Sequence, residues 1–144
     1  MALHIHKVWT MLDKKGNFNS DERMDLLERF EQIFPDTEVA YISGDREFVG
    51  KEWLTYLLLD PAISFRLRIK KSDRISDRKK QLRASIVFAH LKPGQTQILS
   101  GRRWVWGRLM YVSALRLNDG ELLIIITPDA TNSAISDCAQ RWGI

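Results

Sequence analysis

Cysteine is almost missing from this chain, since Cys138 is the single cysteine among 144 residues. One thiol cannot close a disulfide within the chain, and it cannot supply a zinc site built from several cysteines. This usage is typical of proteins kept in a reducing compartment. We therefore expect a cytoplasmic protein.

Long hydrophobic runs are missing as well. The longest run, Leu122 to Ile126, is far shorter than the roughly 20 apolar residues that a membrane-spanning helix needs. The N-terminal residues lack a charged region followed by an apolar core, so we expect no secretory signal peptide and no membrane partner. Internal repeats and low-complexity blocks are also not seen.

What remains is the composition of one globular domain. The chain is 44% hydrophobic and 28% charged, and its length suffices to bury a core. Its net charge of +4 conceals a separation of the two signs along the sequence. Residues 66–116 hold 14 Lys and Arg against 2 Asp and Glu, a balance of +12, whereas the rest of the chain has a balance of −8. A solvated protein face would normally mix both signs, so we favour a nucleic-acid-binding element on a more acidic body.

A stretch near the middle of the acidic part predicts a strand, a loop and a helix in succession. Val39 to Ile42 have strong β propensity, Asp45 follows the small pair Ser43-Gly44, and an amphipathic segment begins after Gly50. The strand would deliver Asp45 to its C-terminal edge, where functional carboxylates often lie. An Asp that merely closes the strand in an Asx turn fits equally well, and both interpretations stay open.

The N-terminal part predicts a strand followed by a helix. Residues 3–12 alternate well enough for one strand, on which His4 and His6 share a face; exposed edge histidines are favoured there over a metal pair. A helix is expected after Ser20, with Pro35 beyond its last turn. Its core face would comprise Met24, Leu26, Leu27, Phe30, Ile33 and Phe34.

Basic strands and loops are expected after the helix of Trp53, Leu54, Leu57 and Leu58. Residues 63–70 alternate apolar and basic side chains, which predicts a half-exposed strand with Arg66, Arg68 and Lys70 on its solvent side. Residues 72–80 are polar and predict a surface loop. Residues 82–91 fit a short helix imperfectly.

The following residues are rich in β signals. Antiparallel strands are expected at 96–99, 103–112 and 115–117, then a hairpin turn at Asn118-Asp119-Gly120 and a buried strand at 122–127. A last helix would start after Thr131-Asn132-Ser133. Its apolar face would comprise Ile135, Cys138, Ala139 and Trp142.

Two tryptophans interrupt a cluster of arginines within this β-rich part. On one strand Trp104 and Trp106 would share a face, with Arg103 on the other and Arg102 and Arg108 at the ends. Indole rings stack on unpaired bases, worth about 1–3 kcal/mol per base, and arginines contact phosphates. Two tryptophans buried in a core are the alternative, and the sequence does not choose between them.

Several segments together resemble a known family of enzymes. In order they are VWTMLDKKGN, DERMDLLERF, GDREFVGKEW, FRLRIKK, LKPG, GRRWVWGRLMYV, LLIIIT and AQRWGI. The sequence is similar over nearly its whole length to bacterial insertion-sequence transposases of the DDE type, whose third acid lies in a Tyr-Arg-Glu-Lys signature. The resemblance implies a ribonuclease H-like α/β fold, a mixed sheet with flanking helices. Residues 1–144 would form part of this catalytic domain, and residues 72–117 a basic, β-rich insertion within it.

The resemblance also implies roles for particular residues. Asp45 matches the second catalytic aspartate, a ligand of Mg²⁺, and Arg141 matches the signature arginine that clamps a phosphate. Trp104 and Trp106 fall where such enzymes place an aromatic ring against a displaced base. The implied partner is DNA at the ends of an insertion element, and the family allows a dimer.

The sequence departs from the family pattern at the other catalytic positions. The first acid would precede Met1, the third would follow Ile144, and Cys138 stands where the signature has tyrosine. Asp45 alone would not hold two Mg²⁺ ions, because Mg²⁺ gives up its waters reluctantly. We therefore expect a transposase fragment that is inactive alone. The alternative is a DNA-binding or interaction module without chemistry, which uses the basic β-rich insertion.

Overall fold

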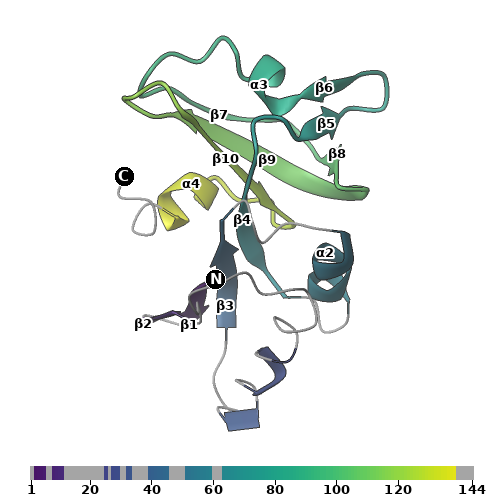
Figure 1. The fold of residues 1–144 in the computed structure, drawn as a ribbon, viewed down its shortest axis with the longest axis vertical. Coiled ribbons are helices and arrows are strands. Elements are labelled where there is room, and N and C mark those ends of the chain that lie inside the picture. Colours follow the sequence, from purple (N-terminus) through teal and green to yellow (C-terminus); the bar gives the residue numbers. More distant parts are fainter. Residues whose placement is uncertain are drawn as a thin grey trace.

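A mixed sheet organises the protein. The computed structural model describes residues 2–5, 8–11, 25, 27–29, 32–33, 39–45, 51–59 and 63–138. They contain ten strands, of which nine follow the order β2-β1-β3-β4-β10-β9-β8-β5-β6, and the tenth, β7, pairs with β9 (Figure 1). The strands of the N-terminal half are Ala2–Ile5 (β1), Val8–Met11 (β2), Val39–Gly44 (β3) and Phe65–Ile69 (β4). Those of the C-terminal half are Arg74–Ser76 (β5), Gln81–Arg83 (β6), Thr96–Ile98 (β7), Arg103–Val105 (β8), Arg108–Arg116 (β9) and Leu122–Thr127 (β10).

Few helices accompany this sheet. The helices with defined ends are Lys51–Leu58 (α2), Ala84–Val87 (α3) and Ala134–Asp137 (α4). The described residues between 25 and 33 are also helical. The expected mixed α/β class is thus confirmed. The strand that ends before Asp45, the helix after Gly50, the hairpin at 118–120 and the buried strand at 122–127 are all present.

The first expected strand is wrong in its extent. The described residues of this segment belong to two strands, because β1 and β2 pair antiparallel with Ile5 opposite Val8. The alternation continues through both arms, so it does not reveal the reversal between them. β1 then pairs with β3, which places the hairpin at one end of the sheet. Nothing is described of the side chain of His4, and His6 lies outside the described residues.

One face of the sheet carries the main core. Trp53, Leu54 and Leu57 of α2 are fully buried in a cluster with Phe65 and Leu67 of β4, as the apolar spacing of the helix predicts. Leu27 joins this core, but Ile33 is 69% exposed, so its expected core position is wrong. Helical spacing gives the width of an apolar stripe but does not show how much of it a neighbour covers. Met24, Leu26, Phe30 and Phe34 lie outside the described residues.

The opposite face holds buried arginines, which corrects the expected half-exposed strand. Every residue of β4 is buried, and Arg66 and Arg68 are only 6% and 7% exposed. Arg66 bonds Asp129 through Nη1 at 2.9 Å and Asp137 through Nε at 3.1 Å, while Arg68 bonds Glu121 at 2.9 Å. The alternation marks a polar face correctly, but acidic partners from later in the chain cover it. Of the three cations expected on the solvent side, Lys70 alone is exposed, and it lies just beyond β4.

The Arg66 guanidinium is the centre of a polar cluster that joins three elements. It also donates to the side chains of Ser64 and Thr127, and it lies 4.8 Å from the ring centre of Tyr41 on β3. The Tyr41 hydroxyl donates to the carbonyl of Asp137 at 3.2 Å. Burial, with the negative charge of Asp137, raises the pKa of Tyr41 to about 12, so the phenol stays a donor at neutral pH. These bonds attach the α4 segment to the sheet.

A second, smaller apolar cluster lies beside these polar contacts. Leu123 and Ile125 of β10 pack against Ala134 and Cys138, with Ile135 against its edge. This confirms the apolar positions 135 and 138 of the last helix, whereas 139–144 lie outside the described residues. In the part of the chain that is described, no helix is long and apolar enough to cross a membrane.

Removing the Arg66 side chain should destabilise the protein. The variant Arg66→Ala leaves Asp129 and Asp137 without their shared cation, and we expect the free energy of unfolding to fall by about 2 kcal/mol. The loss stays below that of a fully buried ion pair because both carboxylates are partly exposed. Urea denaturation measures it. The exposed Arg83→Ala is the control, with a change near zero; equal losses in both variants would contradict the cluster's role.

Candidate nucleic-acid interface

Three short strands form a small exposed sheet at one end of the molecule. β5 pairs antiparallel with β6 and, through Ser76 and Trp104, with β8, which in turn pairs with β9 (Figure 1). Alternate side chains share a face of a strand. Ile75 and Val105 therefore point into the core, whereas the other face presents a set of polar and aromatic side chains. We call it the outer face; it comprises Arg74, Ser76, Gln81, Arg83, Trp104 and Leu109.

Trp106 lies in a tight turn, which corrects the single strand expected at 103–112. Val105 pairs with Arg108, so Trp106 and Gly107 alone form the hairpin loop between β8 and β9. Both have positive φ angles, 53° and 74°. This is the type I′ geometry, which normally selects Asn-Gly and is strained for a bulky residue, at roughly 1–3 kcal/mol. The turn could not be predicted from the sequence, because tryptophan is not a typical residue of such turns.

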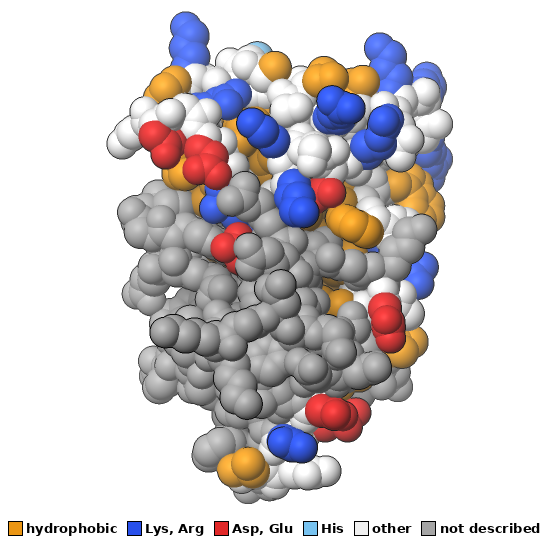
Figure 2. All heavy atoms as spheres, in the orientation of Figure 1, with side chains coloured by type: hydrophobic (Ala, Val, Ile, Leu, Met, Phe, Trp, Pro, Cys, Tyr) orange, Lys and Arg blue, Asp and Glu red, His pale blue; other side chains and the backbone are white. Residues whose placement is uncertain are grey.

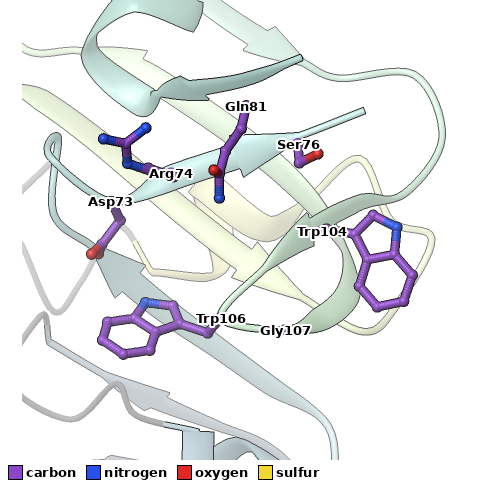
Figure 3. A pocket seen from close by; sticks show the side chains of 7 residues that line it. All are labelled: Asp73, Arg74, Ser76, Gln81, Trp104, Trp106 and Gly107. Carbon is purple, nitrogen blue, oxygen red and sulfur yellow. The ribbon is translucent and has the colours of Figure 1, made fainter. Parts of the chain in front are cut away.

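Both indoles are on the surface, so the alternative of two tryptophans buried in a core is wrong. Trp104 is 42% exposed and Trp106 is 37% exposed. They do not share a strand face, since Trp106 belongs to the turn. They instead line one pocket with a volume of about 470 Å³, together with Asp73, Arg74, Ser76, Gln81 and Gly107. In Figure 3 the Trp106 ring extends toward Asp73, and the Trp104 ring lies on the other side of Gly107.

This pocket combines flat apolar surfaces with polar groups. Its size lies in the range of small-molecule sites, which use a few polar groups to orient a ligand. Gln81 and Ser76 both donate and accept hydrogen bonds, Arg74 donates, and Asp73 accepts. Asp73 already accepts a bond from the backbone N–H of Lys70 at 2.8 Å, which fixes its carboxylate. The pocket suits a planar heterocycle with hydrogen-bonding edges.

Exposed cations surround this surface. Lys and Arg side chains crowd the upper end of the molecule in Figure 2, where β5, β6 and α3 lie. Lys70, Arg102 and Arg108 are exposed and Arg103 is half-buried. Arg108 donates to Thr55 Oγ1 of α2 at 2.8 Å, so it also fastens the hairpin to the body. Of the residues expected to bind DNA, the structure gathers 102, 103, 104, 106 and 108 here and buries 66 and 68 elsewhere.

Asp45 occupies the expected place at the end of a strand. It directly follows β3, which runs parallel to β4, and its side chain is half-buried. Among the described residues, no group of three or more His, Cys, Asp and Glu side chains could hold a metal ion. The described residues therefore do not supply the donor set of the implied Mg²⁺ site. Arg141 lies outside the described residues.

The β5–β6 hairpin contributes site residues that the sequence pattern did not reveal. The surface loop expected at 72–80 is wrong in part, because it contains strand β5. Arg74 and Ser76 of this strand, with Gln81 of β6, form much of the pocket wall. A signal was present, because Arg74-Ile75-Ser76 and Gln81-Leu82-Arg83 each place an apolar residue between polar ones around a polar turn. Strands of three residues are too short for that pattern to stand out.

Comparison with known proteins finds no relative of this chain. No family model, no curated protein and no solved structure matches the chain. The function is therefore inferred from the described residues themselves.

Replacing Trp106 should separate ligand binding from stability. The variant Trp106→Asn gives the turn its preferred residue and relieves the strained backbone, so we expect the melting temperature to stay constant or rise. It also removes one of the two indoles, so binding of single-stranded DNA should weaken about tenfold. Thermal unfolding and fluorescence anisotropy measure the two effects. A lower melting temperature with unchanged binding would mean that the ring serves packing.

Proposed function

We propose that this protein binds DNA through its cationic β unit, defined as residues 72–117, and that it engages an unpaired base there. The observation that carries the proposal is the pair of exposed indoles lining a polar pocket among arginines. Aromatic rings on a protein surface lose apolar contact with water when a base stacks on them. Cations around such rings draw in the phosphates that accompany the base.

The chemistry of this surface suits nucleic acid better than a protein partner. Its apolar area consists of two flat rings and the half-buried Leu109, and long cationic side chains surround them. A protein interface of ordinary size has a wider apolar core depleted in charge. The separation of charge in the sequence agrees, since 12 of the 14 cations between 66 and 116 remain once the buried Arg66 and Arg68 are set aside.

DNA binding should depend on salt and on the arginines beside the indoles. We expect the triple variant Arg102→Ala, Arg103→Ala and Arg108→Ala to weaken binding of a single-stranded oligonucleotide on the order of 10–100-fold. The slope of log K against log salt should fall by about 0.7 for each phosphate that the variant no longer neutralises. Anisotropy titrations at several salt concentrations measure both.

A cation outside the unit provides the control. Arg29 is exposed on the helical segment of the acidic part, and Arg29→Ala should leave affinity and slope unchanged. If the triple variant bound DNA as well as the intact protein, the unit would not be the binding surface.

DNA strand cleavage and transfer of the DDE type is a second candidate. Its favourable observation is Asp45 at the carboxyl end of β3, on the sheet from which the cationic β unit extends. In this proposal Asp45 is one of three acids that hold Mg²⁺, which would activate a water or a 3′-hydroxyl for phosphodiester attack. The described residues contain no such triad, so the other two acids would have to come from elsewhere.

Cleavage assays test this second candidate. The chain alone should not cut insertion-element DNA in Mg²⁺, and Asp45→Ala should bind DNA like the intact protein. Metal-dependent cleavage that Asp45→Ala abolishes would support this second candidate, whereas salt-dependent DNA binding without cleavage would favour binding alone. Loss of DNA binding in Asp45→Ala with intact folding would place the acid in the interface.

A further inference from the structure

A second pocket lies directly beside the first and shares a wall with it. Its volume is about 260 Å³, and its lining includes Ser76 and Trp104, which also line the larger pocket. These two residues face each other as a cross-strand pair of β5 and β8, so their side chains lie on one face of the small sheet. The shared pair therefore separates two adjoining spaces.

The smaller pocket is cationic. Arg78, Arg102 and Arg103 line it, and Asp77 supplies one negative charge. The Asp77 carboxylate is already engaged, because its Oδ1 accepts the backbone N–H groups of Lys79 and Lys80 at 3.1 and 3.0 Å. These bonds, Lys80 first, lower the pKa of Asp77 and keep it ionised. Three guanidinium groups and one carboxylate give the pocket a net positive charge, which attracts an anion.

Local geometry holds these arginines in place. Arg103 donates through Nη1 to the carbonyls of Ser100 and Arg102, which fixes its guanidinium at the pocket. Arg78 has a φ angle of 87° in the turn between β5 and β6, a left-handed conformation that is costly for arginine. Asp77 stabilises this turn with the two bonds described above. Strained backbone positions of this kind cluster at active sites, ligand-binding sites and switch regions.

We propose that one nucleotide occupies both pockets, with its base against Trp104 and Trp106 and its phosphate between Arg78, Arg102 and Arg103. This inference rests on the proposed function and deepens it, because it specifies a base with its own phosphate as the unit of recognition. Arg78 lines the smaller pocket but not the larger one, so its role would be to bind the phosphate and not the base. Arginine suits this task because its planar fork bonds two phosphate oxygens at once.

The same chemistry could come from a free nucleotide or from a nucleotide within a strand. The test uses the whole chain and follows tryptophan fluorescence with deoxyadenosine 5′-monophosphate, deoxyadenosine, inorganic phosphate and a short single-stranded oligonucleotide. We expect the monophosphate to bind about tenfold more tightly than the nucleoside, as two charge-assisted bonds would give. Phosphate alone should bind weakly and leave the fluorescence nearly unchanged.

Arg78→Gly is the decisive variant. Glycine accepts the positive φ angle without strain, so the variant should fold. The preference for the monophosphate over the nucleoside should disappear, and oligonucleotide affinity should fall by a similar factor. Arg29→Ala, which removes an exposed cation outside the cationic β unit, is the control and should keep the preference. Arg102→Ala should act like Arg78→Gly and provides a second measurement should Arg78→Gly melt early.

The outcomes separate this inference from the proposed function. Equal affinity for monophosphate and nucleoside, or a preference retained in both arginine variants, would overturn the two-pocket site. An oligonucleotide bound with the expected salt slope would then still support DNA binding. Binding of the monophosphate without the oligonucleotide would support the two-pocket site but identify a free nucleotide as the ligand, against the proposed function.

Discussion

The ladder between β9 and β10 is the constraint on which the other elements depend. Six residue pairs join the two strands from Leu122 with Arg116 to Thr127 with Tyr111, and β10 is buried along its whole length. β10 contributes Ile124 and Ile126 to the main core and Leu123 and Ile125 to the smaller cluster, so it stabilises both faces of the sheet. β9 is longer, and its first residues extend past this ladder to pair with β8. The indoles are therefore presented by a hairpin whose second arm is anchored in the core.

Arginines in this protein serve two separate purposes. Arg66 and Arg68 are buried, with acidic partners. Arg116 donates to the carbonyls of Leu91, Phe88 and Gly120, so it connects the end of the α3 segment to the β9–β10 hairpin. Arg78 and Arg102 instead line a surface pocket. Sequence alone assigns all of them one sign of charge, whereas burial decides which of them hold the fold and which face a ligand.

The elements that could be predicted are those whose signals are local. β3, α2 and β10 carry apolar runs or helical spacing, and Asn-Asp-Gly at 118–120 forms the expected hairpin because its residues tolerate the required backbone angles. These features depend on neighbours in sequence. The position of Asp45 at the end of its strand could be predicted for the same reason.

The errors arise where distant residues decide the outcome. The alternation of β4 predicts solvent beside Arg66, but Asp129 and Asp137 approach from more than sixty positions away. The turn at Trp106 escapes prediction because its backbone conformation is unusual for tryptophan. The pocket wall could not be predicted either, because β5 and β6 are too short to show a period. Only the pairing of β5 with β8 brings Ser76 next to Trp104. A site formed by three short strands has no signature in any one of them.

The end of the sheet at β6 has a consequence for how the protein behaves among copies of itself. β6 has three residues, and among the described strands it pairs with β5 alone, so its other edge can offer backbone groups to a strand of another copy. Lys79, Lys80 and Arg83 surround that edge, and like charges on two copies repel. The cations that would draw in nucleic acid thus also act as gatekeepers against strand-to-strand aggregation. A polyanion that neutralises them without covering the edge would remove this protection.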